Sequence, residues 1–558
     1  MLSRLRTAVL RPAPVTEAPP EEPDATEVVL RKLDAARRTR RVPLTDAPVA
    51  VAGSTHVRDG LGQEWPQTDL PEDRWRTALT PEHALLVVEV DGAQVAGWSS
   101  GTSPADLAAV ASALGVPSVA WVTGAEPPAA EVDGFDRVLT LPPATAVRTQ
   151  SPDRAPGEER PGAVLVRHES TGGTAYRAGT ANDTTDLTES LSAVGLVAHD
   201  WDLADDGAPS STQALSSQYA VLADVGRRAP AATWPVLDAL ASRTAVVTTP
   251  ERAAGLPEEL RAVVAVAEPH EIRRTASVLA NQAEYRDRAT QQGLRAVLAG
   301  HTFTDRARSL LEAAGAAPAM SPSLSPSPRT VSVVVPTNRP HELDNVLANV
   351  ARQERVDVEL IVVAHGIDVD AADLRARAAE LGVGEVTVVP ATSDQTLGAI
   401  LNLGIDVAGG AYVAKMDDDN FYGGHFLGDL VDAFASTSAG ITGKWAHYVW
   451  LRSSGAVVLR FEKYENTYHR LVQGGSIVAT RDVALDIRFS DIPRAVDSDF
   501  LNRAMAAGVQ TYSADRYNFV SIRGDDRLSH TWKVDDLVFM TGAGRVVTYG
   551  DPRELVSV

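Results

Sequence analysis

The stretch AYVAKMDDDNFYG, residues 411–423, decides the fold of the C-terminal part of this 558-residue chain. Its first six residues predict a strand, and the acidic triplet Asp417, Asp418 and Asp419 follows that strand directly. In open parallel sheets, ligands bind beyond the carboxyl ends of the strands. The stretch therefore predicts an α/β sheet with a charged site at its edge.

The residues before the triplet continue this pattern. Residues 331–335, VSVVV, are almost wholly apolar, as expected of a parallel strand that is buried on both faces. Predicted helices and strands then alternate through 341–353, 358–366 and 371–382. Such alternation is typical of βαβ units, so we expect residues 329–558 to form one α/β domain.

The triplet has a direct chemical consequence. Three adjacent carboxylates repel one another by about 1 kcal/mol per close pair in water, and by about 4 kcal/mol at an effective dielectric near 20. A partly buried cluster therefore favours a divalent cation such as Mg²⁺, which takes one or two carboxylates and completes its shell with phosphate and water. A diphosphate-linked substrate would fit. The alternative is a solvated turn before Asn420 and Gly423, which is the commoner meaning of an isolated acidic triplet.

Length and patterning indicate several domains. With 558 residues, 44% of them hydrophobic, the chain is too long for one core. Strand-like and helix-like runs alternate between residues 83 and 141, and again between 163 and 250. We predict a flexible leader at 1–45, a Rossmann-like lobe at 46–160, a second Rossmann-like lobe at 161–315, a Pro/Ser-rich linker at 316–328, and the catalytic domain at 329–558.

Composition restricts the class of protein. A formal net charge of -21 opposes binding to nucleic acid. The absence of cysteine excludes disulfides, thiolate nucleophiles and zinc–cysteine sites, so histidine and carboxylates must supply any metal site. No apolar run reaches the length of about 18 residues that a transmembrane helix needs, and residues 1–12 lack the core of a signal peptide. We predict a cytoplasmic protein, and leave peripheral membrane contact and oligomerisation open.

Five stretches, taken in order, resemble family-two glycosyltransferases. They are 331–353, 396–423, 473–482, 494–508 and 517–532. The resemblance covers nearly the whole C-terminal domain and implies the GT-A fold, a single nucleotide-binding α/β domain with an Asp-x-Asp metal motif. It also implies a hexosyltransferase that uses Mn²⁺ or Mg²⁺, moves a sugar from a UDP-sugar by default to a glycan or other hydroxyl acceptor with inversion, and acts in cell-envelope polysaccharide synthesis.

The matching motifs imply metal and donor contacts. Asp417 and Asp419 match the metal- and diphosphate-binding pair, and Asp418 lies beside them. His530 is a further candidate metal ligand, with a structural histidine as the alternative. For Arg523 the alternatives are a phosphate contact and a surface salt bridge. The implied donor-binding positions are Pro336, Thr337, Asn338, Arg339, Asp368, Asn402, Asp417, Asp418, Gly474, Gly475, Ser476 and Arg523.

Asp497, in VDSDF, matches the family's general base, which takes the proton of the acceptor hydroxyl and typically contributes about 10² to 10⁴ in rate. Val496 replaces the usual Glu before it, so Asp499 stays a second candidate. There is one more departure from the family. Many relatives carry acidic residues after the second strand, whereas this chain has residues 364–366, AHG, with Asp368 two positions later. The nucleotide base is therefore not determined.

Part of the N-terminal half resembles the C-terminal lobe of two-lobed, GT-B-like glycosyltransferases of the spore-maturation type. The matching stretches are 234–250 and 285–315. Asp238 stands where those enzymes usually have a ribose-binding glutamate, and residues 227–233 lack the earlier acidic residue of their motif. We expect a degenerate lobe that binds acceptor or supports assembly, or a scaffold that binds no ligand.

Two other functions were weighed. A sugar-nucleotide pyrophosphorylase would normally have a Gly-rich basic loop after its first strand, and residues 331–340 contain no such loop. A noncatalytic nucleotide-sugar-binding or assembly protein would not need Asp417, Asp419 and Asp497, all of which are intact. The sequence therefore favours an enzyme.

Overall fold

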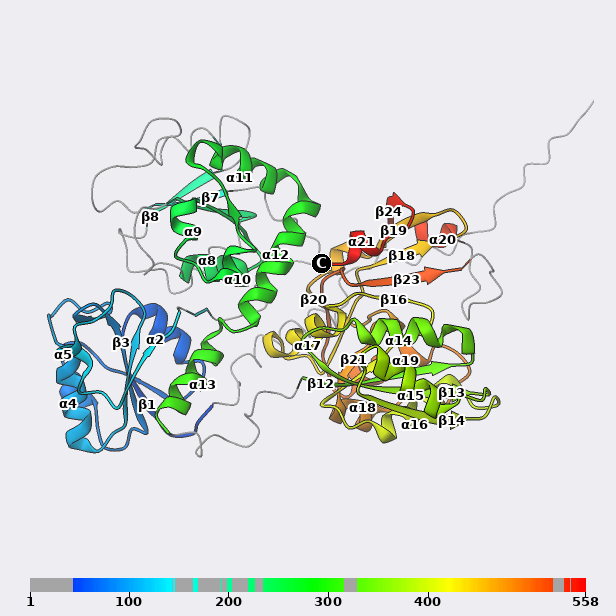
Figure 1. Cartoon of the computed structure of the whole chain (residues 1–558), viewed down its shortest axis with the longest axis horizontal. Helices are drawn as coiled ribbons and strands as arrows, with labels where there is room; N and C mark the ends of the chain where they lie inside the picture. The colour runs from blue at the N-terminus through cyan, green and yellow to red at the C-terminus, as the bar shows by residue number, and fades with distance from the viewer. Residues whose placement is uncertain are drawn as a thin grey trace, which may run out of the picture.

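The structure is a computed structural model that describes residues 44–142, 144–145, 164–168, 191, 198–202, 219–225, 234–315, 329–524, 536–541 and 543–558. Figure 1 shows two α/β lobes from the N-terminal part beside a third α/β domain from the C-terminal part. Parallel strands form the N-terminal lobes and the first half of the large C-terminal sheet. The predicted α/β fold class is confirmed.

The first lobe contains a sheet with parallel strands in the order β2-β1-β3-β5-β6, and the short strand β4 pairs antiparallel with β3. A serine and a proline begin its longest helix, α4 (Pro104–Leu114), because Ser103 accepts a hydrogen bond from the Ala105 amide and Pro104 suits the first turn. Gly115, in the left-handed conformation, ends the helix. The other elements are β1 (Val49–Ala52), α2 (Thr55–Leu61), β2 (Gln67–Asp69), α3 (Trp75–Ala78), β3 (Leu85–Asp91), β4 (Gln94–Val95), β5 (Ser118–Val122), α5 (Ala129–Val132) and β6 (Arg137–Thr140).

The second lobe is also a parallel sheet, in the order β11-β10-β9-β7-β8. Its strands are β7 (Val164–His168), β8 (Ala198–Asp202), β9 (Val221–Asp224), β10 (Ala245–Thr248) and β11 (Ala265–Val266). The helices between residues 234 and 313 are α8 (Trp234–Ala241), α9 (Pro250–Ala253), α10 (Glu258–Arg261), η2 (Pro269–Glu271), α11 (Ile272–Asn281), α12 (Ala283–Leu298) and α13 (Phe303–Ala313).

Helix α13 returns to the first lobe, although it lies within the range predicted for the second. Phe303, Ala307 and Leu310 on this helix join the same buried cluster as Val49 of β1 and Trp121 of β5. The chain therefore leaves the second lobe before residue 315, where the sequence placed the end of that lobe. Burial of an apolar helix face against the first sheet decides this crossing.

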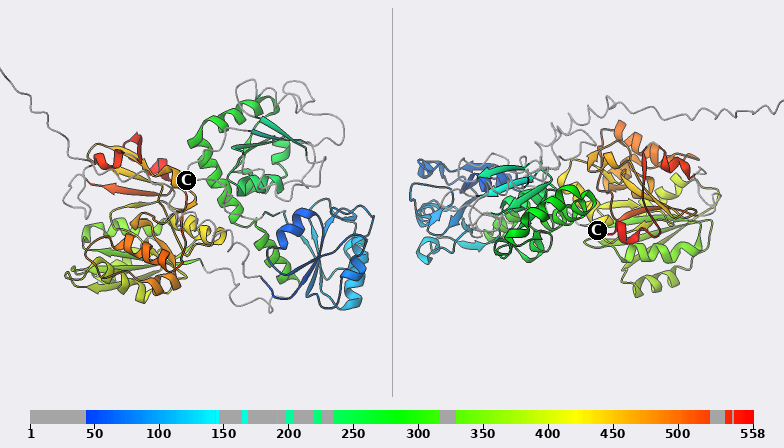
Figure 2. Two further views of the ribbon diagram at one scale, coloured as in Figure 1. Left: turned by 180° about the vertical axis from the view of Figure 1, so that it is seen from behind. Right: turned by 90° about the horizontal axis from the view of Figure 1, so that it is seen from above.

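Helix α12 connects the second lobe to the C-terminal domain (Figure 2). The Arg295 guanidinium donates two hydrogen bonds to the Asp429 carboxylate, at 2.9 and 2.8 Å, and the two side chains are only 10% and 3% exposed. Arg516 of the C-terminal domain pairs with Glu284 at 2.9 Å and with Asp287 at 3.0 Å, both on α12. One buried charge pair, and the pairing of the buried Arg516 guanidinium with two partly exposed carboxylates, thus hold this helix against the C-terminal domain.

The C-terminal domain contains an eight-stranded sheet in the order β14-β13-β12-β15-β21-β17-β22-β20, and a five-stranded sheet in the order β16-β23-β18-β19-β24. The large sheet contains β12 (Thr330–Thr337), β13 (Asp357–His365), β14 (Glu385–Ala391), β15 (Tyr412–Lys415), β17 (Ile441–Gly443), β20 (Thr467–Tyr468), β21 (Val478–Thr480) and β22 (Thr511–Ser513). The small sheet contains β16 (Phe421–Tyr422), β18 (His447–Leu451), β19 (Ala456–Arg460), β23 (Phe519–Arg523) and β24 (Gly544–Tyr549).

Helices cover both faces of the large sheet. Val333 and Val335 of β12 pack in one buried cluster with the apolar face of α14, while Val334 packs on the opposite face with α16. This alternation explains the continuous apolar run, because a strand covered on both sides needs no polar face. The helices of the domain are η5 (Pro340–Glu342), α14 (Leu343–Ala351), α15 (Ala371–Glu380), α16 (Leu397–Val407), α17 (Phe426–Ser436), η6 (Glu462–Tyr464), η7 (Gly474–Ser476), α18 (Arg481–Ile487), α19 (Val496–Ala506), α20 (Leu537–Met540) and α21 (Arg553–Val556).

Among the helices that the structure describes, none has the length and apolar character required to span a bilayer.

A buried histidine makes the stability of the C-terminal domain depend on pH. Burial lowers the pKa of His447 from 6.5 to about 4. The unfolded chain therefore binds a proton below pH 6.5 that the folded domain does not bind until about pH 4. The free energy of unfolding should fall by at most about 3 kcal/mol as the pH drops through this window.

Urea denaturation of the full chain between pH 4 and 7 measures this dependence. The His447→Gln variant should show a shallower loss of stability with falling pH than the wild type. His341→Gln is the control, because the His341 side chain is 75% exposed, and it should retain the wild-type slope. Equal slopes for His447→Gln and the wild type would refute the assignment.

Candidate active site

The loop after β12 and the acidic triplet lie together because their strands are neighbours. β12 and β15 pair in parallel, so their carboxyl ends lie at the same edge of the sheet. Thr337 Oγ1 donates a hydrogen bond of 2.6 Å to Asp418 Oδ2. The Arg339 guanidinium binds both the Asp418 carboxylate and Asp419 Oδ2, the latter at 2.9 Å. The nucleotide-loop residues predicted from sequence therefore contact the predicted diphosphate site.

Lys415 joins the triplet to the candidate base. Its Nζ donates hydrogen bonds to Asp417 Oδ1 at 2.8 Å and to the Gly474 carbonyl at 3.2 Å. The same Nζ lies 3.5 Å from Asp497 Oδ1. The side chain of Lys415 is only 5% exposed. The two acidic stretches singled out in the sequence thus share one cluster, hereafter the acidic cluster: Asp417, Asp418, Asp419, Asp497, Lys415 and Arg339.

Two glycines bring the backbone of η7 against this cluster. A Cβ at Gly474 would overlap the carboxylate of Asp497, and a Cβ at Gly475 would overlap that of Asp417. Tyr422 OH accepts the Asp417 amide at 2.7 Å and donates to the Gly475 carbonyl at 2.7 Å. Because only glycine leaves room at these two positions, the loop lies directly beside both carboxylates.

The charges of the cluster perturb one another. Burial raises the pKa of Asp497. The charge of Lys415 acts to lower this pKa and the charge of Asp417 acts to raise it, and overall the pKa lies above its ordinary value. Burial, followed by the charge of Asp417, also raises the pKa of Asp419 above its ordinary value. Although burial opposes it, the attraction of Asp417 and Asp497 raises the pKa of Lys415 overall, so this lysine is charged at neutral pH. The site is therefore a negatively charged cluster that contains a buried internal cation, Lys415.

The cluster fits a divalent ion by charge. When ionised, its four carboxylates face two cations, which leaves two negative charges. Within the described part of the chain, no three acidic or histidine side chains are arranged to hold a metal ion. In this structure Arg339 binds Asp419 Oδ2 and Lys415 binds Asp417 Oδ1. By their place in the Asp-x-Asp motif, Asp417 and Asp419 are the carboxylates that would hold an ion.

Two candidates lie apart from the acidic cluster. Asp499 pairs with Arg503 at 2.9 Å, one turn further along α19. Since successive helical residues are about 100° apart, Asp497 and Asp499 point in different directions. Asn402 is bound to the backbone of Phe489, donating to its carbonyl at 2.8 Å and accepting its amide at 2.9 Å. Its amide anchors the loop before α19, and a contact with the donor stays a prediction.

The remaining predicted residues have varied surroundings. Pro336 is half-buried in β12, while Asn338 and Asp368 are exposed in the loops after β12 and β13. Ser476 is fully buried, and its hydroxyl accepts the Lys444 amide at 2.9 Å. Burial lowers the pKa of Arg523, although the charges of Asp536 and Asp419 act to raise it. His530 lies outside the described residues.

Several residues that hold the triplet in place were not predicted from the sequence. Lys415 could have been noticed as a charged residue within an otherwise apolar strand. Asn345 and Asn349, four residues apart on the apolar helix α14, donate to the carbonyls of Asp418 at 2.7 Å and of Asn420 at 2.9 Å. Asn420 in turn donates to Asp417 Oδ2 at 3.2 Å. The sequence signal for these residues was the spacing of Asn345 and Asn349, which places two polar side chains on the same face of a helix that packs against the sheet.

The close approach of η7 gives a direct prediction. We expect Gly474→Ala to displace the Asp497 carboxylate and to lower kcat about 10²-fold, since a displacement of about 1 Å near reacting groups can cost that much. Gly384→Ala is the matched control, because a Cβ there meets nothing within 4 Å and that glycine has no positive φ. Steady-state kinetics of both variants decide the matter. If Gly474→Ala is as active as Gly384→Ala, the loop does not constrain Asp497.

A model of one protein family matches part of the chain. Residues 332–480 match the model of glycosyl transferase family 2. No curated protein matches the sequence.

Several solved structures are similar to 35% of this chain, each with a TM-score of 0.28. They include mannosyltransferase PcManGT from Pyrobaculum calidifontis in complex with GDP-Man and Mn²⁺, at 18% identity over 56% of that chain. TarS 1-349 of S. aureus in complex with UDP-GlcNAc is 17% identical over 59% of its length. GalNAc-T7 with UDP, GalNAc and Mn²⁺ is 12% identical over 44%. The chain thus spans less than two thirds of each of these proteins.

Proposed function

We propose that the C-terminal part of this chain, in which residues 332–480 match the model of glycosyl transferase family 2, has the GT-A fold and transfers a sugar from a nucleotide-sugar donor to an acceptor hydroxyl. One observation carries the proposal. Lys415 lies between Asp417 and Asp497, so the carboxylates suited to the donor diphosphate and to the acceptor proton are in one cluster. A noncatalytic binding protein would need the Asp417 carboxylate for the diphosphate but would not need the Asp497 carboxylate.

Asp497 acts as the general base in this proposal. Its carboxylate takes the proton of the acceptor hydroxyl, the hydroxyl oxygen forms a bond to the anomeric carbon, and the bond from that carbon to the diphosphate oxygen breaks with inversion. The raised pKa of Asp497 makes it a stronger base than an exposed aspartate. Lys415 Nζ lies 3.5 Å from this carboxylate, and the backbone of Gly474 lies against it.

The leaving diphosphate gains negative charge as the bond breaks. Arg339 brings a positive charge to the loop after β12, where it contacts Asp418 and Asp419. Asn420 and Lys415 hold the Asp417 carboxylate from two sides. A divalent ion bound by Asp417 and Asp419 would supply the remaining neutralisation of the diphosphate.

Several details of the proposal rest on the sequence resemblance. These are the hexosyl donor with UDP as the default nucleotide, the choice of Mn²⁺ or Mg²⁺, a glycan acceptor, a cytoplasmic location, and a role in cell-envelope polysaccharide synthesis.

A donor panel tests the function without knowledge of the acceptor. The full chain is incubated with UDP-, GDP- and dTDP-sugars and Mn²⁺, Mg²⁺ or EDTA. Binding is measured as a thermal shift and donor hydrolysis as released nucleoside diphosphate. A donor at a hundredfold excess over its Kd stabilises the folded protein by about 2.7 kcal/mol. We expect metal-dependent hydrolysis that Asp417→Ala abolishes.

The other outcomes are equally informative. Equal release by the wild type and Asp417→Ala across the panel would overturn the enzyme assignment. Donor binding without release, even with added hydroxyl acceptors, would favour the nucleotide-sugar-binding alternative. Formation of a nucleotide sugar from a nucleoside triphosphate and a sugar phosphate would favour the pyrophosphorylase.

A further inference from the structure

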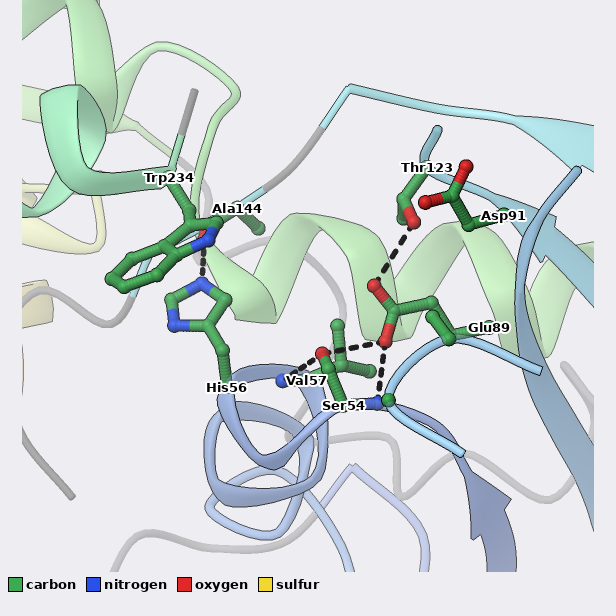
Figure 3. Close-up of a pocket in the computed structure, with 10 residues that line it drawn as sticks. Ser54, His56, Val57, Glu89, Asp91, Thr123, Ala144 and Trp234 are labelled. Carbon is green, nitrogen blue, oxygen red and sulfur yellow. Dashed lines mark hydrogen bonds between the residues drawn. The ribbon is translucent and has the colours of Figure 1, made fainter. Parts of the chain in front are cut away.

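A cavity of about 200 Å³ lies in the first lobe, outside the C-terminal domain (Figure 3). We propose that this cavity binds a hydroxyl-rich ring without negative charge, such as a neutral or amino sugar unit. The proposal concerns a second, noncatalytic ligand site. It goes beyond the transfer reaction and does not depend on it.

The topology places the cavity where parallel sheets bind ligands. β1, β3 and β5 are parallel neighbours, so their carboxyl ends meet at one edge of the first sheet. Ser54 lies just beyond β1, Glu89 and Asp91 lie at the end of β3, and Thr123 directly follows β5. Trp234, the first residue of α8, lines the cavity from the second lobe.

The polar wall is held in place without a ligand. Glu89 Oε2 accepts the Ser54 amide at 2.8 Å and Ser54 Oγ at 2.6 Å, while Oε1 accepts Thr123 Oγ1 at 2.9 Å. Asp91 Oδ1 accepts the Ala125 amide at 2.8 Å. Because these groups are already oriented, a ligand would lose little free energy in ordering them.

The charge of the wall selects the class of ligand. Ionised carboxylates only accept hydrogen bonds, so Glu89 and Asp91 favour hydroxyl or ammonium donors. None of the described residues that line the cavity is a lysine or arginine. A phosphate or carboxylate would meet these two acidic side chains, with no lysine or arginine to pair with it among the described lining residues. The cavity therefore disfavours nucleotides and sugar phosphates.

An aromatic wall faces this polar wall. His56 stacks on Trp234 with 4.8 Å between ring centroids and 26° between planes, and His56 Nε2 lies 2.9 Å from the Ala144 carbonyl. Figure 3 shows these two rings on one side of the cavity and Glu89 and Thr123 on the other. An apolar wall with few fixed polar groups is the usual design of small-molecule sites, and the volume lies below the about 300–1,000 Å³ of pockets for drug-sized ligands. A single sugar ring suits both features.

Ligand-observed NMR on the full chain tests the proposal. The probes are glucose, galactose, glucosamine and glucose 6-phosphate. We expect saturation transfer to at least one uncharged or amino sugar and none to glucose 6-phosphate. Trp234→Ala and Asp91→Asn should weaken binding at least tenfold, and Trp234→Phe, which keeps an aromatic ring, should retain it. Far-UV circular dichroism establishes that each variant is folded.

Matched controls are available on the same chain. Tyr285→Ala removes a 58% exposed aromatic side chain, and Asp106→Asn removes an exposed carboxylate of the first lobe; neither should change sugar binding. The Trp234→Ala variant should hydrolyse the donor at the wild-type rate. A failure of the sugar-binding proposal can therefore be distinguished from a failure of the transferase proposal. No binding by any neutral or amino sugar, unchanged binding in Trp234→Ala and Asp91→Asn, or equal binding of glucose 6-phosphate would each overturn it.

Discussion

Replacing Asp497 by asparagine is expected to lower kcat about 10²- to 10⁴-fold, with little change in the Kd of the donor. Asparagine has nearly the same shape but cannot take the acceptor proton. Lys415 and the Gly474 backbone would still pack around it, so the fold of the cluster should persist. Transfer is measured by steady-state kinetics with a donor and acceptor found by screening, and donor affinity by the thermal shift.

Asp499→Asn is the matched control for this prediction. It makes the same chemical change two residues further along α19, but removes only an ion pair with Arg503 in which the Asp499 side chain is 33% exposed. Its kcat should stay within a few-fold of the wild type. A large loss in Asp499→Asn together with an active Asp497→Asn would exchange the roles of the two aspartates.

Breaking the contact between α12 and α17 should produce the largest loss of stability. Arg295→Met leaves the Asp429 carboxylate buried without its bidentate partner, and the removal of one member of a buried pair typically costs about 3–5 kcal/mol. Urea denaturation of the full chain measures this cost. Hydrogen exchange should also show faster exchange of the α12 amides, because the helix loses its strongest contact with the C-terminal domain.

Two further variants separate this pair from a general effect of charge removal. Arg488→Met removes a surface pair with Asp406, in which the two side chains are 37% and 50% exposed, and should cost no more than about 1 kcal/mol. The double variant Arg295→Met/Asp429→Leu should be more stable than Arg295→Met alone, because no unpaired carboxylate remains buried. Equal costs for Arg295→Met and Arg488→Met would show that the pair does not hold α12.

Much of the C-terminal fold could be predicted locally. The apolar run at 331–335 indicated a strand covered on both faces, and Val333 and Val334 do pack against opposite helix layers. The path of α13 could not be predicted in this way. Its apolar face suits either lobe, and only the shape of the first lobe's core, with Phe303 against Trp121, decides between them.

By itself, the sequence determined the alternation of strands and helices and the position of the acidic triplet at a strand end, because both depend on residues close together in the chain. Only the tertiary structure decided which distant groups meet. Lys415 reaches Asp497, 82 positions away, because β15 and η7 pack side by side. Asn402 donates a hydrogen bond to the carbonyl of Phe489, which lies in the loop between α18 and α19, and no local sequence pattern predicts the path of that loop. Contacts between distant segments depend on how whole elements pack, and a carboxylate's chemistry depends on those contacts.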